Sequence, residues 1–192
     1  MLEGQDVVRI LFHQIDDGDR RKMDAESNDA ASGGGARDFR FRPDLRFLPF
    51  FGRMLPNRRN EARTLEGLPG VVEVYYGPFV IPQAEIQPTG PAHEMVVWPE
   101  TPSRPRECRI ARVHTYGFSA LVEDDPNGGK SIFMLFQTTD GTVRAWFTTE
   151  TGLQAPGWDD TVRNFAMTWL ATETKSGFLD LDPAYHEQYP DG

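Results

Sequence analysis

Arginine is concentrated in two short stretches of this chain, and arginine is the side chain best suited to bind phosphate. Residues 33–63 (GGGARDFRFRPDLRFLPFFGRMLPNRRNEAR) carry eight arginines against three acidic residues, and residues 103–112 (SRPRECRIAR) carry four arginines against Glu107. Neither stretch contains a lysine. The guanidinium group is planar and permanently charged, and it can donate paired hydrogen bonds to a phosphate or to a guanine edge. The two stretches therefore predict nucleic-acid binding.

The rest of the chain is strongly acidic. The 192 residues have a formal net charge of −9 at pH 7, although the two arginine-rich stretches contribute +5 and +3. The other residues therefore carry −17, which phosphate would repel over a Debye length of about 8–10 Å. This distribution argues against nonspecific coating of nucleic acid and is compatible with focused binding.

Candidates for catalysis or metal binding are weak by comparison. Residues 173–175 (ETK) imitate the acid and lysine of restriction-type nucleases, but no strand carries a partner aspartate upstream of them. The four histidines are scattered singly, with none at metal-ligand spacing. Cys108 has no clear histidine partner for nucleophilic catalysis. We therefore expect no enzyme activity, no metal and no cofactor.

The elements that position the arginines are expected to be short strands. Fifteen prolines and eighteen glycines, with turn signals every ten residues or so, favour many short strands over long helices. Asp140-Gly141 predicts a hairpin. Residues 159–175 predict the one C-terminal helix, with Asp159 or Asp160 as its cap and Gly177 as its end. The expected strands are 6–15 (strand or short helix), 71–76, 94–98, 107–114, 118–122, 131–138 and 142–149.

Residues 37–42 (RDFRFR) alternate between apolar and charged side chains. A strand here places Phe39 and Phe41 on one face and the charged side chains on the other. Pro43 ends this strand, and residues 44–55 predict a short helix with apolar side chains packed inward. An alternative interpretation is that the phenylalanines are core residues and the arginines are only the outer face of the same elements.

A single domain covering residues 1–192 is expected from the length. Residues 16–36 are polar, acidic and then glycine-rich, which predicts a flexible loop. Residues 178–192 predict a peripheral acidic tail. The lone cysteine excludes an internal disulfide, and no secretory or membrane-spanning apolar run is present, so we expect a cytoplasmic protein with no membrane partner.

Several motifs resemble the N-terminal effector-binding domain of the EcoRII restriction endonuclease. The matching pieces are GGGARDFRFRP, FFGRMLP, VEVYY and RECRIARV, within roughly residues 5 to 150. The resemblance implies a DNA-binding pseudobarrel of about seven strands with short helices, in which two arm-like loops enter the major groove. It also implies that Glu107 and Arg109 contact bases. The chain departs from this family at Ala36, Phe41 and Cys108, where the family has histidine, tyrosine and lysine.

Two function hypotheses follow. The first is a sequence-specific double-stranded DNA-binding module of the restriction–modification type, without its nuclease domain and located at the nucleoid. In this hypothesis Glu107 accepts a hydrogen bond from a cytosine amino group or orients Arg109. Alternatively, Glu107 only forms a salt bridge to Arg106 or Arg109 and reads no base. The alternative is an acidic protein-binding accessory or inhibitor module that meets a basic partner. The sequence is compatible with a protein partner or a homodimer, and it does not specify the recognised DNA sequence or the sensitivity to methylation. The predicted DNA-binding residues are Arg37, Asp38, Arg40, Arg42, Arg104, Arg106, Glu107, Arg109 and Arg112.

Overall fold

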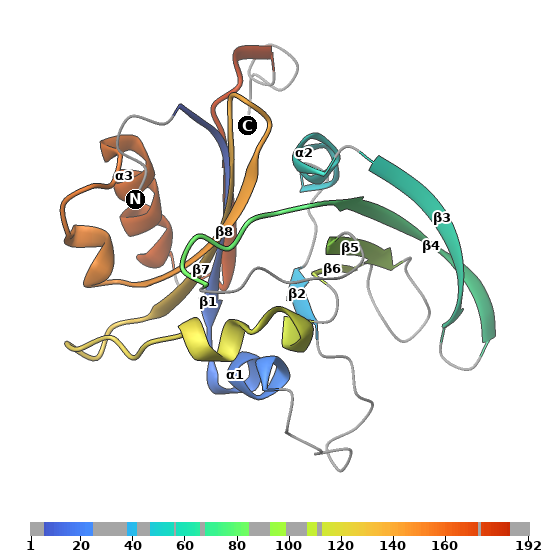
Figure 1. Ribbon diagram of the computed structural model, residues 1–192, viewed down its shortest axis with the longest axis horizontal. Coiled ribbons are helices and arrows are strands. Elements are labelled where there is room, and N and C mark those ends of the chain that lie inside the picture. Colours follow the sequence, from blue (N-terminus) through green and yellow to red (C-terminus); the bar gives the residue numbers. More distant parts are fainter. Residues whose placement is uncertain are drawn as a thin grey trace. The chain divides into compact units, whose positions relative to one another are not determined.

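The computed structural model shows a mostly β chain that divides into two compact units (Figure 1). Unit 1 comprises Met1–Arg20, Phe79–Gln87 and Ser119–Gly192, and unit 2 comprises Arg21–Pro78 and Pro88–Phe118. Each unit contains one antiparallel sheet. The residues that the structure describes are 6–24, 38–41, 47–55, 57–65, 68–84, 93–98, 107–110, 113–172 and 174–184.

The sheet of unit 1 has four strands in the order β8-β7-β1-β9. Strand β1, predicted from its apolar sequence, lies between β7 and β9 and pairs antiparallel with both. Every residue of β7 is buried, while β8 alternates between buried and half-buried residues. Such alternation is typical of a strand with one face on a core. The strands are β1 (Val7–Ile15), β7 (Ser131–Thr138), β8 (Val143–Thr149) and β9 (Ser176–Asp180).

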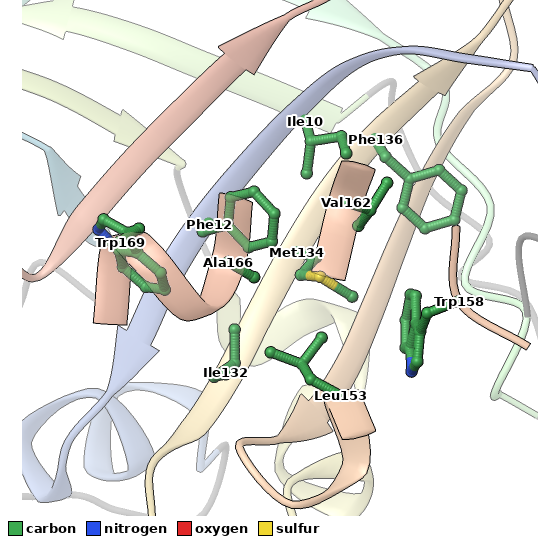
Figure 2. Close-up of a cluster of buried hydrophobic side chains, with 10 residues drawn as sticks. All are labelled: Ile10, Phe12, Ile132, Met134, Phe136, Leu153, Trp158, Val162, Ala166 and Trp169. Carbon is green, nitrogen blue, oxygen red and sulfur yellow. The ribbon is translucent and has the colours of Figure 1, made fainter. Parts of the chain in front are cut away.

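Helix α3 (Asp160–Leu170) packs against this sheet and confirms the start of the predicted C-terminal helix. The predicted end was wrong, because the helix stops at Leu170 and Gly177 belongs to β9. The side chain of Asp159 caps the helix by accepting hydrogen bonds from the backbone N–H groups of Thr161 and Val162, at 2.9 and 3.3 Å. Figure 2 shows the core between the helix and the sheet. Its buried residues are Ile10, Phe12, Ile132, Met134, Phe136, Leu153, Trp158, Val162, Ala166 and Trp169.

The sheet of unit 2 has five strands in the order β2-β6-β5-β4-β3, all antiparallel. One face carries buried side chains in matching register, among them Phe41, Cys108 and Val97 across three neighbouring strands. The other face also has buried residues, namely Val72, Val74 and Arg109. The ring of Phe118 stacks on Phe39 with 6.3 Å between centroids. The strands are β2 (Phe39–Phe41), β3 (Asn57–Leu65), β4 (Leu68–Gly77), β5 (His93–Trp98) and β6 (Glu107–Ile110), and α2 is Phe47–Met54.

Some elements differ from the sequence expectations. Residues Phe118–Leu121, expected as a strand, form a 3-10 helix, and the strand expected over 107–114 ends at Ile110 before a second 3-10 helix, Val113–Tyr116. Gly117 lies between these two helices with φ at +70°, a turn conformation that interrupts an extended chain. The sequence did not predict strands β3 and β9.

Two stretches that were expected to be irregular contain regular structure. Helix α1 (Asp17–Met23) lies within the stretch 16–36 that was expected to be a flexible loop, and residues 25–36 lie outside the described residues. The first three residues of the expected peripheral tail, Phe178–Asp180, belong to β9, which pairs with β1. Within the described part of the chain, no helix has the length and apolar character needed to cross a membrane.

Candidate nucleic-acid interface

The two arginine-rich stretches meet at one pair of strands. Strand β2, from the first stretch, pairs antiparallel with β6, from the second, in the register Phe39↔Ile110, Arg40↔Arg109 and Phe41↔Cys108. Antiparallel pairing fixes these residues about 5 Å apart across the sheet. Stretches that are distant in sequence are therefore neighbours in unit 2.

Arg40 and Arg109 lie in direct register but in different surroundings. Arg40 is exposed, whereas Arg109 is only 3% exposed. The Arg109 guanidinium forms an ion pair with the carboxylate of Asp38, at 3.5 Å, and the side chain of Asp38 is itself largely buried. A buried charge requires such a partner, because desolvation otherwise costs several kcal/mol. Among the predicted binding residues whose side chains the structure describes, Arg40 is thus the exposed one.

The remaining predicted binding residues are described in part or not at all. Glu107 begins β6, and its backbone pairs with Trp98. The other five lie outside the described residues: Arg37, Arg42, Arg104, Arg106 and Arg112.

A row of register partners continues from Arg109 across the whole sheet. Arg109 pairs with Val96, Val96 with Val74, and Val74 with Arg59. Directly paired residues share one face of a sheet, so Arg40, Arg109 and Arg59 belong to the same face. We call these three residues the arginine row. Four strand spacings of about 4.8 Å separate the backbones of its ends by about 19 Å.

Strand β3 adds a charged cluster on the same face. The Glu61 carboxylate accepts hydrogen bonds from Arg59 at 3.1 Å and from Arg63 at 2.9 Å. The hydrogen bond from Arg63 is the largest influence on the pKa of Glu61, which these arginines lower despite partial burial. The guanidinium of Arg59 also lies over the ring of Tyr76, 4.8 Å from its centroid. The cluster is therefore ionised and carries a net positive charge.

Sequence reasoning did not assign the arginines of β3 to the site. Arg58, Arg59 and Arg63 lie inside the first arginine-rich stretch, yet the segment NRRNEARTL has too few apolar residues to resemble a strand. The signal that could have found it is the spacing of Arg59, Glu61 and Arg63, because residues two apart in a strand share a face. Arg58, on the other face, is largely exposed and forms an ion pair with Glu73.

Charge is divided unequally between the two units. Unit 2 contains 14 lysines and arginines against 11 acidic residues, a formal charge of +3. Unit 1 contains 6 against 18, a formal charge of −12. The acidity of the whole chain therefore resides in unit 1, and the unit that contains the arginine row is the cationic one.

Two of the weak catalytic candidates, Lys175 and His13, are held by contacts within unit 1. The Nζ atom of Lys175 lies 2.5 Å from the Asp16 carboxylate and 2.7 Å from that of Asp19. His13 is fully buried between the Ser176 hydroxyl, 2.7 Å from Nδ1, and Asp19, 3.2 Å from Nε2. These contacts join α1 to β1 and to the start of β9.

In the part of the chain that the structure describes, the thiol is buried and the possible metal ligands form no group. Cys108, the only cysteine of the chain, is completely buried on the core face of β6. Across the part of the chain that the structure describes, no group of three His, Cys, Asp or Glu residues is placed to hold a metal ion. The arginines of unit 2 are therefore the strongest candidate site.

Comparisons with known proteins add no assignment. No family model matches the chain, and no match was found to a curated protein or to a solved structure. The assignment of function therefore rests on the residues and geometry of unit 2.

Proposed function

We propose that unit 2 is a sequence-specific double-stranded DNA-binding module, similar in role to the effector-binding domain of a restriction endonuclease. The observation that carries this proposal is the pairing of β2 with β6, which brings the two arginine-rich stretches together. The +3 charge of unit 2 supports it, since the cationic residues are separated in sequence from most of the acidic ones. In this proposal the five-stranded sheet is part of a DNA-binding pseudobarrel.

Phosphate contacts are assigned to the two ends of the arginine row, the exposed Arg40 and the half-buried Arg59. A row about 19 Å long is wider than the major groove, which measures about 12 Å. Arg40 at one end and Arg59 at the other would then contact phosphates on the two sides of one groove. Such contacts position the protein on the duplex without reading its sequence.

Base contacts are assigned to the residues that flank β2 and β6. Arg37, Arg106 and Glu107 carry this role in the proposal, because Arg37 and Arg106 shortly precede β2 and β6 in sequence and Glu107 begins β6. Arg109 acts mainly as a positioning residue, since contact with a base would require its ion pair with Asp38 to open. Asp38 in turn holds Arg109 beside Arg40 in the row.

The test is a selection of bound duplexes from a randomised library, followed by titration of the preferred duplex. We expect wild-type protein to enrich a defined sequence and Arg40→Ala to weaken binding to every duplex alike. Lys130→Ala is the matched control, because it removes one exposed positive charge from unit 1. Enrichment of no sequence, or equal losses in Arg40→Ala and Lys130→Ala, would contradict the proposal.

A second candidate function is binding of a basic protein partner through unit 1. It is favoured by the −12 charge of that unit and by the strongly exposed side chains of Asp124 and Asp160. Titration with an arginine-rich peptide and with duplex DNA at equal ionic strength separates the two functions. Binding of the peptide without binding of any duplex would favour the second one.

A further inference from the structure

Strand β3 is a long and regular edge strand. Its nine residues pair with β4 from Asn57↔Tyr76 to Leu65↔Leu68 without a register shift, and it contains no proline. Among the described residues, no strand pairs with its other edge. Figure 1 shows β3 as the outer strand of a long curved hairpin. Long edge strands are templates for pairing with another chain, and proteins usually shorten or interrupt them.

We propose that β3 pairs antiparallel with β3 of a second copy of this chain, so that two five-stranded sheets join around a two-fold axis. A partner strand supplies main-chain hydrogen bonds, and its side-chain pattern supplies selectivity. The charge pattern of β3 is what selects a second copy. Arg59, Glu61 and Arg63 alternate in sign along one face, and such a pattern can complement itself when one strand runs opposite to the other.

The two-fold axis restricts the register. If Asn60 lies opposite the partner's Asn60, then Arg59 lies opposite the partner's Glu61, and Glu61 lies opposite the partner's Arg59. If the axis passes at Ala62 instead, Glu61 lies opposite the partner's Arg63. An axis at Glu61 would place like charges opposite each other, which is unfavourable. Charge therefore selects the registers centred on Asn60 or on Ala62.

The charged side chains are suitably placed for such pairing. Side-chain exposure is 39% for Arg59, 35% for Glu61 and 28% for Arg63, so each can reach a partner while remaining bonded within its own strand. The lowered pKa of Glu61 keeps it ionised at neutral pH. A carboxylate has room for more than two hydrogen bonds, so Glu61 can accept from the partner's arginine as well.

Cysteine cross-linking tests the proposed register. Native Cys108 is buried, so Asn60→Cys and Ala62→Cys each introduce the one accessible thiol. Residues directly opposite in an antiparallel pair have Cα atoms about 4.5–5.5 Å apart, within the range of a disulfide. We expect one of the two variants to form a covalent dimer rapidly under mild oxidation. Ser119→Cys, at an exposed position of unit 1, is the control and should cross-link slowly.

A charge exchange tests the pairing by an independent route. In the register centred on Asn60, Arg59→Glu should weaken the dimer about tenfold or more, because it places like charges opposite each other. Adding Glu61→Arg restores opposite charges across the axis and should restore most of the affinity. In the register centred on Ala62, Arg63→Glu and Glu61→Arg behave in the same way. Rescue distinguishes lost pairing from a misfolded strand.

Sedimentation equilibrium gives the deciding result. We expect wild-type protein to dimerise at micromolar concentration with or without DNA, so a failure of DNA binding leaves this proposal intact. A monomer at about 100 μM, or equal cross-linking rates for all three cysteine variants, would overturn it. A dimer that neither charge exchange affects would also overturn it, since the interface would then lie elsewhere.

Discussion

Arg40 and Arg109 lie directly opposite each other on β2 and β6, yet one is exposed and the other is buried. Arg40 lies on β2, at the edge of the sheet, whereas Arg109 lies on the inner strand β6 and forms an ion pair with Asp38, which precedes β2. Two arginines that are paired across β2 and β6 therefore have different roles. Arg40 is available to a ligand, and Arg109 holds the two strands together.

Loss of Arg109 is predicted to destabilise the fold. Arg109→Ala leaves the largely buried carboxylate of Asp38 without this cation, and breaking such a pair costs about 3 kcal/mol of unfolding free energy. Arg40→Ala, at the neighbouring exposed position, should change the unfolding free energy little. Urea unfolding monitored by circular dichroism measures both variants. Equal stability of the two would show that the Arg109–Asp38 pair has no structural role.

The contact between Gly177 and Trp169 is predicted to tolerate no side chain. A Cβ atom at Gly177 would lie 2.6 Å from Cδ1 of Trp169, so either β9 or the indole must move. Overpacking of this kind typically costs about 1–3 kcal/mol. We expect Gly177→Ala to lower the thermal midpoint. In a protein that already carries Trp169→Leu, the indole is absent, so Gly177→Ala should lower the midpoint less. Additive effects of the two substitutions would contradict this explanation.

Acid sensitivity is predicted for two turns of unit 1. Hydrogen bonds, first from the Thr138 hydroxyl and then from the Thr142 backbone, lower the pKa of Asp140 from 3.8 to about 2. The backbone N–H of Thr151 is the main cause of a similar lowering of the pKa of Asp125. Because the folded-state pKa is below the unfolded value, this stabilisation is complete above about pH 4 and is lost as the pH falls toward 2.

Stability measured between pH 6 and pH 2 checks this prediction. Asp140→Asn and Asp125→Asn should each reduce the loss of stability over the window from about pH 4 to pH 2. Asp160→Asn is a suitable control, because that side chain is strongly exposed. An unchanged acid response in both turn variants would show that other carboxylates cause it.

Local sequence signals predicted the elements that local interactions determine. Asp159 predicted the start of α3 because a capping side chain bonds only to nearby backbone, and Asp140-Gly141 predicted the β7–β8 hairpin for a similar reason. Strand β3 was missed because it is an edge strand of mainly polar residues, stabilised by pairing with β4. Helix α1 was missed because contacts with distant residues hold it, among them Lys175 with Asp19.

The candidate site was predictable in composition but not in detail. The clustering of arginines is visible in the sequence, and so is the alternation that places Phe39 and Phe41 on the buried face. The burial of Arg109 depends on Asp38, which is 71 residues away in the chain. No local pattern reveals such a pair. The same limit applies to the arginine row, which exists only through the register of five strands.

Cleavage of DNA is predicted to be absent. Lys175, the lysine of the nuclease-like ETK sequence, is engaged by Asp16 and Asp19 at the start of α1. Metal-assisted hydrolysis requires carboxylates that hold the ion beside the scissile phosphate. We expect plasmid and linear duplexes to stay intact with the protein and Mg²⁺, as judged on agarose gels. If the protein cleaves DNA and Glu173→Ala abolishes the cleavage, the protein is a nuclease and the proposed function is wrong.

The salt dependence of duplex affinity tests the central claim most directly. Fluorescence anisotropy of the preferred duplex between about 50 and 200 mM salt gives a slope of log affinity against log salt for wild type, Arg40→Ala and Lys130→Ala. Each lost phosphate contact reduces that slope by about 0.9. We predict this reduction for Arg40→Ala and no change for Lys130→Ala. Identical slopes in all three proteins, or no binding to any duplex at 50 mM salt, would contradict DNA binding through the arginines of unit 2.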